Sequence, residues 1–260
     1  MSVKIMFRKN PLLPRLEDGP PLVGCWSHLV SPAAAEILAL CGYDFVIIDN
    51  EHGPTSLSES TIIMMAVSTT PAATLMRVPW NDPVYIKRAL DTGIEGLMIP
   101  AVEDAEAARR AVAACRYPPE GIRGVAYAVT RAADYGLKLA EYAEKANDNL
   151  VVMCQVETAK TVDNIEAIGA VDGIDVLFIG PFDLSASMGK PGQFDDPEVA
   201  DALERAEAGI RASGKTLGGI LRPGDSLAAM VKRGYGLMIS ASDATLLRDA
   251  ALADLKTARG

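Results

Sequence analysis

The sequence predicts a single (β/α)8 barrel of the TIM type. From Leu22 onward, short apolar runs alternate with longer amphipathic segments, which is typical of parallel strands joined by helices. Eight such units fit in 260 residues, a usual length for a TIM barrel. An open, doubly wound sheet is the alternative, but no G-x-G-x-x-G motif follows the first predicted strand, which disfavours it.

The first four units are delimited by helix caps and turn residues. An irregular arm, residues 1–21, precedes a barrel domain that spans 22–260. Ser31-Pro32 and Asp82-Pro83 are typical helix starts, with a capping side chain followed by proline in the first turn. The predicted strands are 22–27, 45–49, 73–78 and 96–101, and the predicted helices are 33–40, 57–67, 83–90 and 104–115.

A long irregular stretch, Tyr117–Ala132, separates the two halves of the chain. It is too long for a simple connection, and long ordered loops are often functional. A helix is expected at 133–146. The remaining predicted strands are 150–156, 176–179, 216–221 and 236–239, and the remaining predicted helices are near 161–168, 197–212, 226–232 and 243–256.

Composition excludes several classes of protein. The net charge of −9 argues against a nucleic-acid partner, which favours a basic face. The four cysteines form no C-x-x-C pair, so they are expected to be reduced thiols in a cytoplasmic protein. No apolar run approaches the roughly 18–20 residues of a membrane span, and the N-terminus lacks the apolar segment of a secretory signal.

In a TIM barrel the chemistry lies where strands end and βα loops begin. The strand Phe45–Asp49 ends in Asp49-Asn50-Glu51-His52. We expect His52 to act as a general base that Asp49 orients or charges. A solvated acidic loop is the alternative for this segment. The other predicted strand ends supply Trp26, His28, Arg77, Pro100, Glu103, Gln155, Glu157, Gly180, Pro181, Asp183, Arg222, Ser240, Ser242 and Asp243.

Glu157 and Asp183 end adjacent predicted strands, and Gln155 shares a strand face with Glu157. Two such carboxylates can hold one hard divalent ion, although each is also a possible helix cap. Arg77 at the barrel mouth is expected to bind an oxyanion of the substrate, and the alternative is an ion pair with a nearby acidic residue. No predicted strand contains a lysine that could form a Schiff base with the substrate. A metal ion is therefore expected to stabilise an enolate instead.

Five motifs, in order along the chain, resemble the HpcH/HpaI aldolase family of metal-dependent pyruvate aldolases. The similarity runs from about Leu22 to Leu255. The motifs are Asp49-Asn50-Glu51-His52-Gly53-Pro54, Arg77-Val78-Pro79-Trp80-Asn81-Asp82-Pro83, Arg116-Tyr117-Pro118-Pro119-Glu120-Gly121-Ile122-Arg123-Gly124, Gln155-Val156-Glu157-Thr158 and Phe178-Ile179-Gly180-Pro181-Phe182-Asp183-Leu184-Ser185.

The resemblance implies a phosphoenolpyruvate/pyruvate-type barrel whose last helix packs on a neighbouring subunit, in a hexamer built as a trimer of dimers. It implies Mg²⁺, Mn²⁺ or Co²⁺ on Glu157 and Asp183, with His52 as the base working with Asp49. It also implies that Arg77 lies beside the 2-oxo oxygen. The residues expected to contact substrate are Trp26, Gln155, Gly180, Pro181, Phe182 and Arg123.

The implied reaction is the reversible cleavage of a 4-hydroxy-2-oxo acid to pyruvate, or a similar 2-oxo acid such as hydroxypyruvate, and an aldehyde. A CoA-ester lyase of the citrate-lyase β type is an alternative, but the sequence shows no Lys/Arg cluster for the CoA phosphates. A metal-dependent 2-oxo acid decarboxylase and a non-catalytic binding barrel are the others. The aldehyde pocket is expected between the 117–132 loop, the N-terminal arm and the neighbour's last helix, with Arg123 or Tyr127 either meeting a polar tail or making a structural contact.

The chain departs from the family pattern at four positions. Asn50 stands where close relatives tend to have glycine, Gly53 and Phe182 where they tend to have alanine, and His28 where an apolar residue is expected. None of these positions is a predicted metal ligand or the predicted base. The departures therefore bear on the identity of the substrate.

Overall fold

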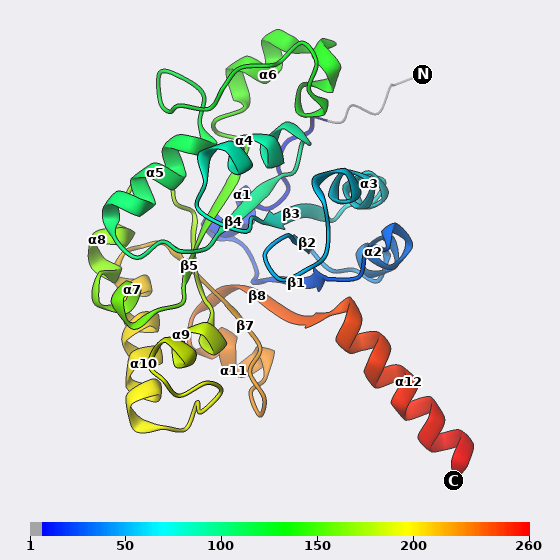
Figure 1. The fold of residues 1–260 in the computed structure, drawn as a ribbon, viewed down its shortest axis with the longest axis vertical. Helices are drawn as coiled ribbons and strands as arrows, with labels where there is room; N and C mark the ends of the chain where they lie inside the picture. Colours follow the sequence, from blue (N-terminus) through cyan, green and yellow to red (C-terminus); the bar gives the residue numbers. More distant parts are fainter. Residues whose placement is uncertain (1–6) are drawn as a thin grey trace.

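Eight parallel strands close into a barrel in the order in which they occur along the chain, with β8 returning to pair with β1 (Figure 1). The computed structural model describes residues 7–260. The prediction of a (β/α)8 barrel is therefore confirmed. The strands are β1 Leu22–Ser27, β2 Phe45–Asp49, β3 Ala73–Arg77, β4 Gly96–Ile99, β5 Val151–Val156, β6 Val176–Ile179, β7 Thr216–Ile220 and β8 Tyr235–Ser242.

Several of the helices that follow the strands begin at caps read from the sequence. The Ser31 side chain accepts the Ala34 N–H, and Asp82 accepts the Tyr85 N–H, each satisfying a donor that the first helical turn leaves free. Asp196 caps its helix in the same way. These helices are α2 Pro32–Leu40, α3 Leu57–Val67, α4 Pro83–Asp91, α5 Ala105–Cys115, α7 Ala159–Asp163, α8 Ile165–Gly169, α9 Pro181–Ser187, α10 Pro197–Ala212, α11 Leu227–Lys232 and α12 Asp243–Arg259.

Two apolar layers explain why the strands read as nearly continuous hydrophobic runs. One fills the barrel interior and includes Phe45, Leu75 and Met153. The other lies between the strands and the surrounding helices and includes Val46 and Ile48. Alternate residues of β2 therefore face different layers, and all five of its residues are buried, Asp49 included. The cost of burying Asp49 has to be offset by partners at the strand end.

The N-terminal arm is not wholly irregular, because it contains the short helix α1 Leu13–Asp18. Leu12 is buried with the residues inside the barrel. The Arg8 guanidinium contacts Glu95 and the Ala72 carbonyl, which precede β4 and β3. The arm therefore closes the amino-terminal end of the barrel, opposite the end where the βα loops begin.

The helix expected at 133–146 is confirmed only in its second half. A 3-10 segment, Arg131–Gly136, and the helix α6 Leu139–Lys145 occupy this region. Asp134 and Tyr135 adopt left-handed conformations with φ of 51° and 53°, which interrupts an α-helix. The Asp134 carboxylate accepts the backbone N–H of Phe7 from the arm. A contact between residues far apart in the sequence therefore occurs where the expected helix is interrupted.

Helix α12 extends away from the barrel, as its red ribbon in Figure 1 shows. Asp243 at its start is its only buried residue. Leu246, Leu247, Leu252 and Leu255 are all exposed.

The four cysteines are free thiols, of which Cys41 is exposed. Within residues 7–260, none of the helices combines the length and the apolar character that crossing a membrane requires.

Candidate active site

A cavity of about 530 Å³ opens at the carboxyl ends of the strands. Its lining includes eight residues predicted from the sequence: Trp26, His52, Arg77, Gln155, Gly180, Pro181, Phe182 and Asp183. His28, Phe178, Ile220, Leu221, Ser240, Ala241, Ser242 and Thr245 complete the lining. Most of the predicted residues, from strands far apart in sequence, therefore meet around one cavity.

A buried ion pair lies at the base of this cavity. Because Asp49 and Arg77 are register partners on β2 and β3, their side chains are adjacent. Arg77 Nε lies 2.9 Å from Asp49 Oδ1 and Nη2 lies 2.6 Å from Oδ2, a bidentate geometry. The guanidinium also stacks 4.4 Å above the Trp26 ring. Burial raises the pKa of Asp49, but hydrogen bonds from His28 and Arg77 outweigh it and hold this pKa well below its usual range.

The predicted pairing of Asp49 with the His52 imidazole takes a different form. Asp49 Oδ1 accepts the backbone N–H groups of Glu51, at 3.0 Å, and His52, at 3.3 Å. The carboxylate within 4 Å of the imidazole is Glu51, whose Oε2 lies 3.9 Å from His52 Nε2. Asp49 therefore fixes the loop that carries His52, while Glu51 is the acidic side chain beside the ring.

The turn that carries His52 leaves no room for a side chain at Gly53. A Cβ on Gly53 would lie 2.3 Å from the Asp49 carbonyl oxygen. The His52 side chain is 61% exposed, so its imidazole is free to turn toward the cavity that it lines.

His28, a strand-end residue at which the chain departs from the family pattern, lines the cavity and contacts the buried ion pair. Its Nε2 lies 3.0 Å from Asp49 Oδ2, the oxygen that Arg77 Nη2 also contacts. Its backbone N–H donates to Asp243 Oδ1 at the start of α12. The alternation of Trp26 and His28 at the end of β1 was the available signal, since residues two apart share a face.

Glu157 lies between two donors and two other carboxylates. Its Oε1 accepts the Ala101 N–H at 2.7 Å, and its Oε2 accepts from Gln155 Nε2 at 2.6 Å. Burial, together with the negative charges of Glu51 and Asp183, raises the pKa of Glu157 to about 7 and outweighs the hydrogen bond from Ala101, which lowers it. The pKa of Glu51 is raised chiefly by burial as well.

These carboxylates fit a hard divalent cation. Glu157 is half-buried and Asp183, in the first turn of α9, faces the cavity. Across residues 7–260, no three His, Cys, Asp or Glu side chains are grouped closely enough to form a metal site by themselves. Two carboxylates with the other positions left to water and substrate match the way Mg²⁺ is usually bound. A cation here would also offset the mutual repulsion that raises the pKa of Glu157.

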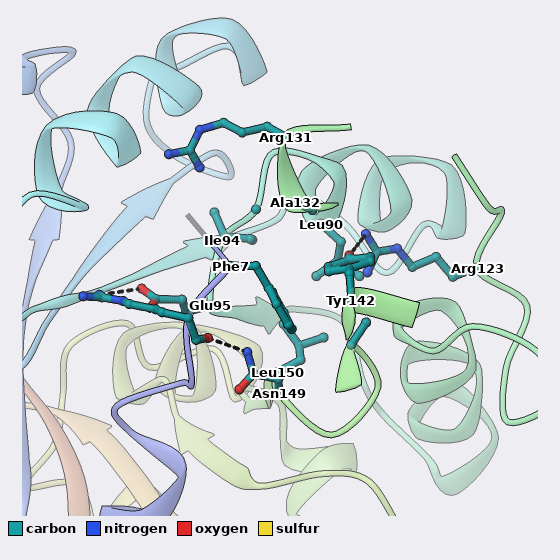
Figure 2. Close-up of a pocket in the computed structure, with 13 residues that line it drawn as sticks. Phe7, Leu90, Ile94, Glu95, Arg123, Arg131, Ala132, Tyr142, Asn149 and Leu150 are labelled. Atoms are coloured by element: carbon teal, nitrogen blue, oxygen red, sulfur yellow. Dashed lines mark hydrogen bonds and ion pairs between the residues drawn. The ribbon is translucent and has the colours of Figure 1, made fainter. Parts of the chain in front are cut away.

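Arg123 lies outside this cavity. Its guanidinium is 2.8 Å from Asp91 Oδ1, 3.2 Å from the Tyr142 hydroxyl and 4.3 Å above the Tyr117 ring. Figure 2 shows it with Tyr142 at a separate cavity of about 40 Å³, to which Phe7 of the arm also contributes. Arg123 therefore contacts Asp91, Tyr142 and Tyr117, and it is absent from the lining of the active-site cavity. Among residues 7–260, the arm and the 117–132 loop likewise contribute no residue to the lining of the active-site cavity.

The model of the HpcH/HpaI aldolase/citrate lyase family matches residues 22–250. The chain belongs to this family. It is 44% identical over 246 residues to a hydroxypyruvate/pyruvate aldolase of Sagittula stellata, an alignment that covers 94% of this chain and 96% of that protein. It is 43% identical over 240 residues to a 4-hydroxy-2-oxo-heptane-1,7-dioate aldolase of Salmonella typhimurium, covering 92% of this chain and 90% of that one.

A solved structure of another HpcH/HpaI family protein, from Burkholderia cenocepacia, superposes with a TM-score of 0.90. The two sequences are 39% identical, and the superposition covers 96% of this chain and 100% of the other. The likeness to members of the HpcH/HpaI family thus extends over almost the whole barrel.

Proposed function

We propose that this HpcH/HpaI family member is a class II aldolase. It cleaves a 4-hydroxy-2-oxo acid reversibly to pyruvate, or a similar 2-oxo acid such as hydroxypyruvate, and an aldehyde. The observation that carries the proposal is one cavity lined by Asp183, Arg77 and His52. Glu157 lies behind this lining, hydrogen-bonded to Gln155 and close enough to Asp183 for the two charges to interact. The names of the two relatives, both aldolases, support it.

The proposed cofactor is Mg²⁺, Mn²⁺ or Co²⁺ held by Glu157 and Asp183. When bound, such an ion supplies Lewis-acid stabilisation of the negative charge that develops on the 2-oxo oxygen. Gln155 holds Glu157 in place by its 2.6 Å hydrogen bond, so the amide acts as a support for the carboxylate.

The 2-oxo acid end of the substrate is proposed to bind beside α9. The first N–H groups of a helix lack partners within the helix, and we propose that those that follow Gly180-Pro181 help to hold the substrate carboxylate. Arg77 presents a positive charge to the 2-oxo oxygen. Asp49, Glu51 and the Trp26 ring hold its guanidinium in a fixed orientation, which favours preorganised stabilisation of the enolate.

His52 is proposed to move the proton. In cleavage, its neutral imidazole takes the proton of the 4-hydroxyl group, the C3–C4 electron pair moves to C3, and the C4–O bond becomes the carbonyl of the aldehyde. The enolate of pyruvate that remains then takes a proton at C3. Glu51, 3.9 Å from Nε2, stabilises the imidazolium form. In synthesis these bonds form and break in reverse.

Two measurements test this function. His52→Ala is expected to abolish nearly all aldol cleavage while leaving binding of Mn²⁺ intact, as measured by titration calorimetry. Treatment with a chelator is expected to stop the reaction, and full activity in the chelated enzyme would contradict the metal-dependent mechanism. Product analysis separates the decarboxylase alternative, since that reaction releases CO₂ and forms no aldehyde.

We further propose that α12 packs on a neighbouring subunit within a hexamer. Its exposed leucines, 246, 247, 252 and 255, support this proposal, because a lone helix gains little by presenting them to water. Removal of residues 244–260 is expected to lower the mass that light scattering measures in solution. An unchanged mass would contradict this assembly.

A further inference from the structure

Asp243, the first residue of α12, has a buried carboxylate that the helix does not need as a cap. Ser242 is the N-cap, because its side chain accepts the Thr245 N–H and Thr245 completes a capping box. An acidic residue in the first turn can favour a helix from an exposed position, through the helix dipole. Among the residues of α12, all of which the structure describes, Asp243 is nevertheless the one that is buried. The cost of burying a carboxylate has to be offset by hydrogen-bond donors.

Most of these donors come from the turn between β1 and α2. The His28 N–H donates to Asp243 Oδ1 at 2.9 Å, and the Leu29 N–H donates to Oδ2 at 3.0 Å. The Ser27 hydroxyl lies 3.4 Å from Oδ2, and the Ala244 N–H of α12 itself donates to Oδ1 at 2.7 Å. Hydrogen bonds to a carboxylate are stronger than bonds between neutral groups. The Asp243 side chain therefore fixes the backbone of the turn that carries His28.

The His28 side chain connects this turn to the buried ion pair. Its Nε2 lies 3.0 Å from Asp49 Oδ2, and the same oxygen is 2.6 Å from Arg77 Nη2. Asp49 is fully buried, so solvent does not replace a partner that its carboxylate loses. Trp26, two residues before His28, stacks on the Arg77 guanidinium. A displacement of the turn would therefore disturb the contacts that hold Arg77 from two sides.

We propose that Asp243 is a positioning residue for the aldol reaction. It holds the β1–α2 turn so that His28 keeps the Asp49–Arg77 pair in the orientation that stabilises the enolate. The inference rests on the proposed aldolase function, and Asp243 itself is not among the residues that line the cavity. Its effect on the rate is indirect but large, because a misplacement of about 1 Å at a reacting group can lower a rate about 100-fold.

The test measures exchange of the C3 protons of pyruvate for deuterium in D₂O, with Mn²⁺ supplied and mass spectrometry as the readout. This exchange reports formation of the enolate and requires no aldehyde. Asp243→Asn is expected to lower the rate at saturating pyruvate by at least about 10-fold. The KM for pyruvate and the affinity for Mn²⁺, measured by titration calorimetry, should stay near their wild-type values.

Asp254→Asn removes an exposed carboxylate further along α12 and is the matched control, with a rate expected to equal that of the wild type. A role for Asp243 in stability alone would lower the melting temperature and leave the rate of the folded enzyme unchanged. That result for Asp243→Asn would overturn the proposal.

Variants of His28 test the path between Asp243 and the ion pair. His28→Leu removes the contact with Asp49 and is expected to lower the exchange rate, whereas His28→Gln, which keeps an N–H donor for Asp49, should retain most of it. In the His28→Leu background, Asp243→Asn should cause little further loss, because residues that act through one another are not additive. Losses that multiply in full would overturn the proposal.

The His28→Leu variant also decides the matter if Asp243→Asn does not fold. A wild-type exchange rate in His28→Leu would then overturn the proposal. If the wild-type enzyme exchanges no deuterium, the aldolase function itself fails and this inference fails with it. Exchange in the wild type that the Asp243 and His28 variants leave unchanged overturns this inference alone, so the two failures are distinguished.

Discussion

Replacing Glu157 with glutamine should make the metal-free protein less sensitive to alkaline pH. Glu157 is half-buried, and the charges of Glu51 and Asp183 act on it in addition to burial. Its pKa rises from 4.5 to about 7 in the folded protein. The folded state therefore binds the proton of this carboxyl group more tightly than the unfolded chain does.

The sign and size of the effect follow from this difference. Below pH 4.5 Glu157 is protonated in both states, and its contribution to the free energy of unfolding is fully present. That contribution is lost as the pH rises toward about 7, because the ionised carboxylate is disfavoured in the folded state and not in the unfolded chain. At 1.36 kcal/mol per pH unit, the metal-free wild type should lose about 2 kcal/mol of unfolding free energy at Glu157 between pH 5.5 and pH 8. Glutamine has no proton to release, so Glu157→Gln should lack this loss.

Urea denaturation of the chelator-treated protein at both pH values measures the effect. Glu166→Gln, which removes an exposed carboxylate on α8, is the matched control and should follow the wild type. Added Mn²⁺ at pH 8 should stabilise the wild type and not Glu157→Gln, since the ion replaces the proton on the same carboxylate pair. Equal pH dependence in the wild type and Glu157→Gln would refute the reasoning.

Three further outcomes are expected. Asp49→Asn should destabilise the fold by about 3–5 kcal/mol in urea denaturation, because it breaks the buried ion pair between Asp49 and Arg77 and leaves Glu51 as the remaining carboxylate beside the guanidinium. In the wild type the low pKa of Asp49 should keep that contribution at neutral pH, with a decline on acidification below about pH 4. Arg123→Ala should lower the melting temperature while kcat/KM stays near the wild-type value, and a large loss of kcat/KM without a loss of stability would contradict the structural role of Arg123.

The sequence identified the barrel and much of its site because those features are local. Caps such as Ser31 and Asp82 start helices through contacts within one turn, so their positions are readable without the fold. Apolar runs mark strands that are buried on both sides. Once the strands are placed, their carboxyl ends must meet at one end of the barrel, which is why Arg77, Gln155 and Asp183 could be grouped in advance.

Contacts between distant segments decided the rest. The helix expected at 133–146 breaks where Asp134 binds the backbone of Phe7, more than a hundred residues earlier, and no local pattern encodes that contact. The sequence predicts that Arg123 contacts substrate, because it lies in a long loop. In the fold, however, Arg123 is surrounded by Asp91, Tyr117 and Tyr142.

The sequence by itself determined which strands end in ionisable residues, and therefore that one end of the barrel carries the chemistry. Only the tertiary structure decided how those residues pair. Asp49 lies three residues before His52, but its side chain contacts Arg77 and His28 from the two neighbouring strands. The reason is that strand register, set by the packing of the whole barrel, brings these side chains within hydrogen-bond distance. Sequence spacing alone carries no information on that distance.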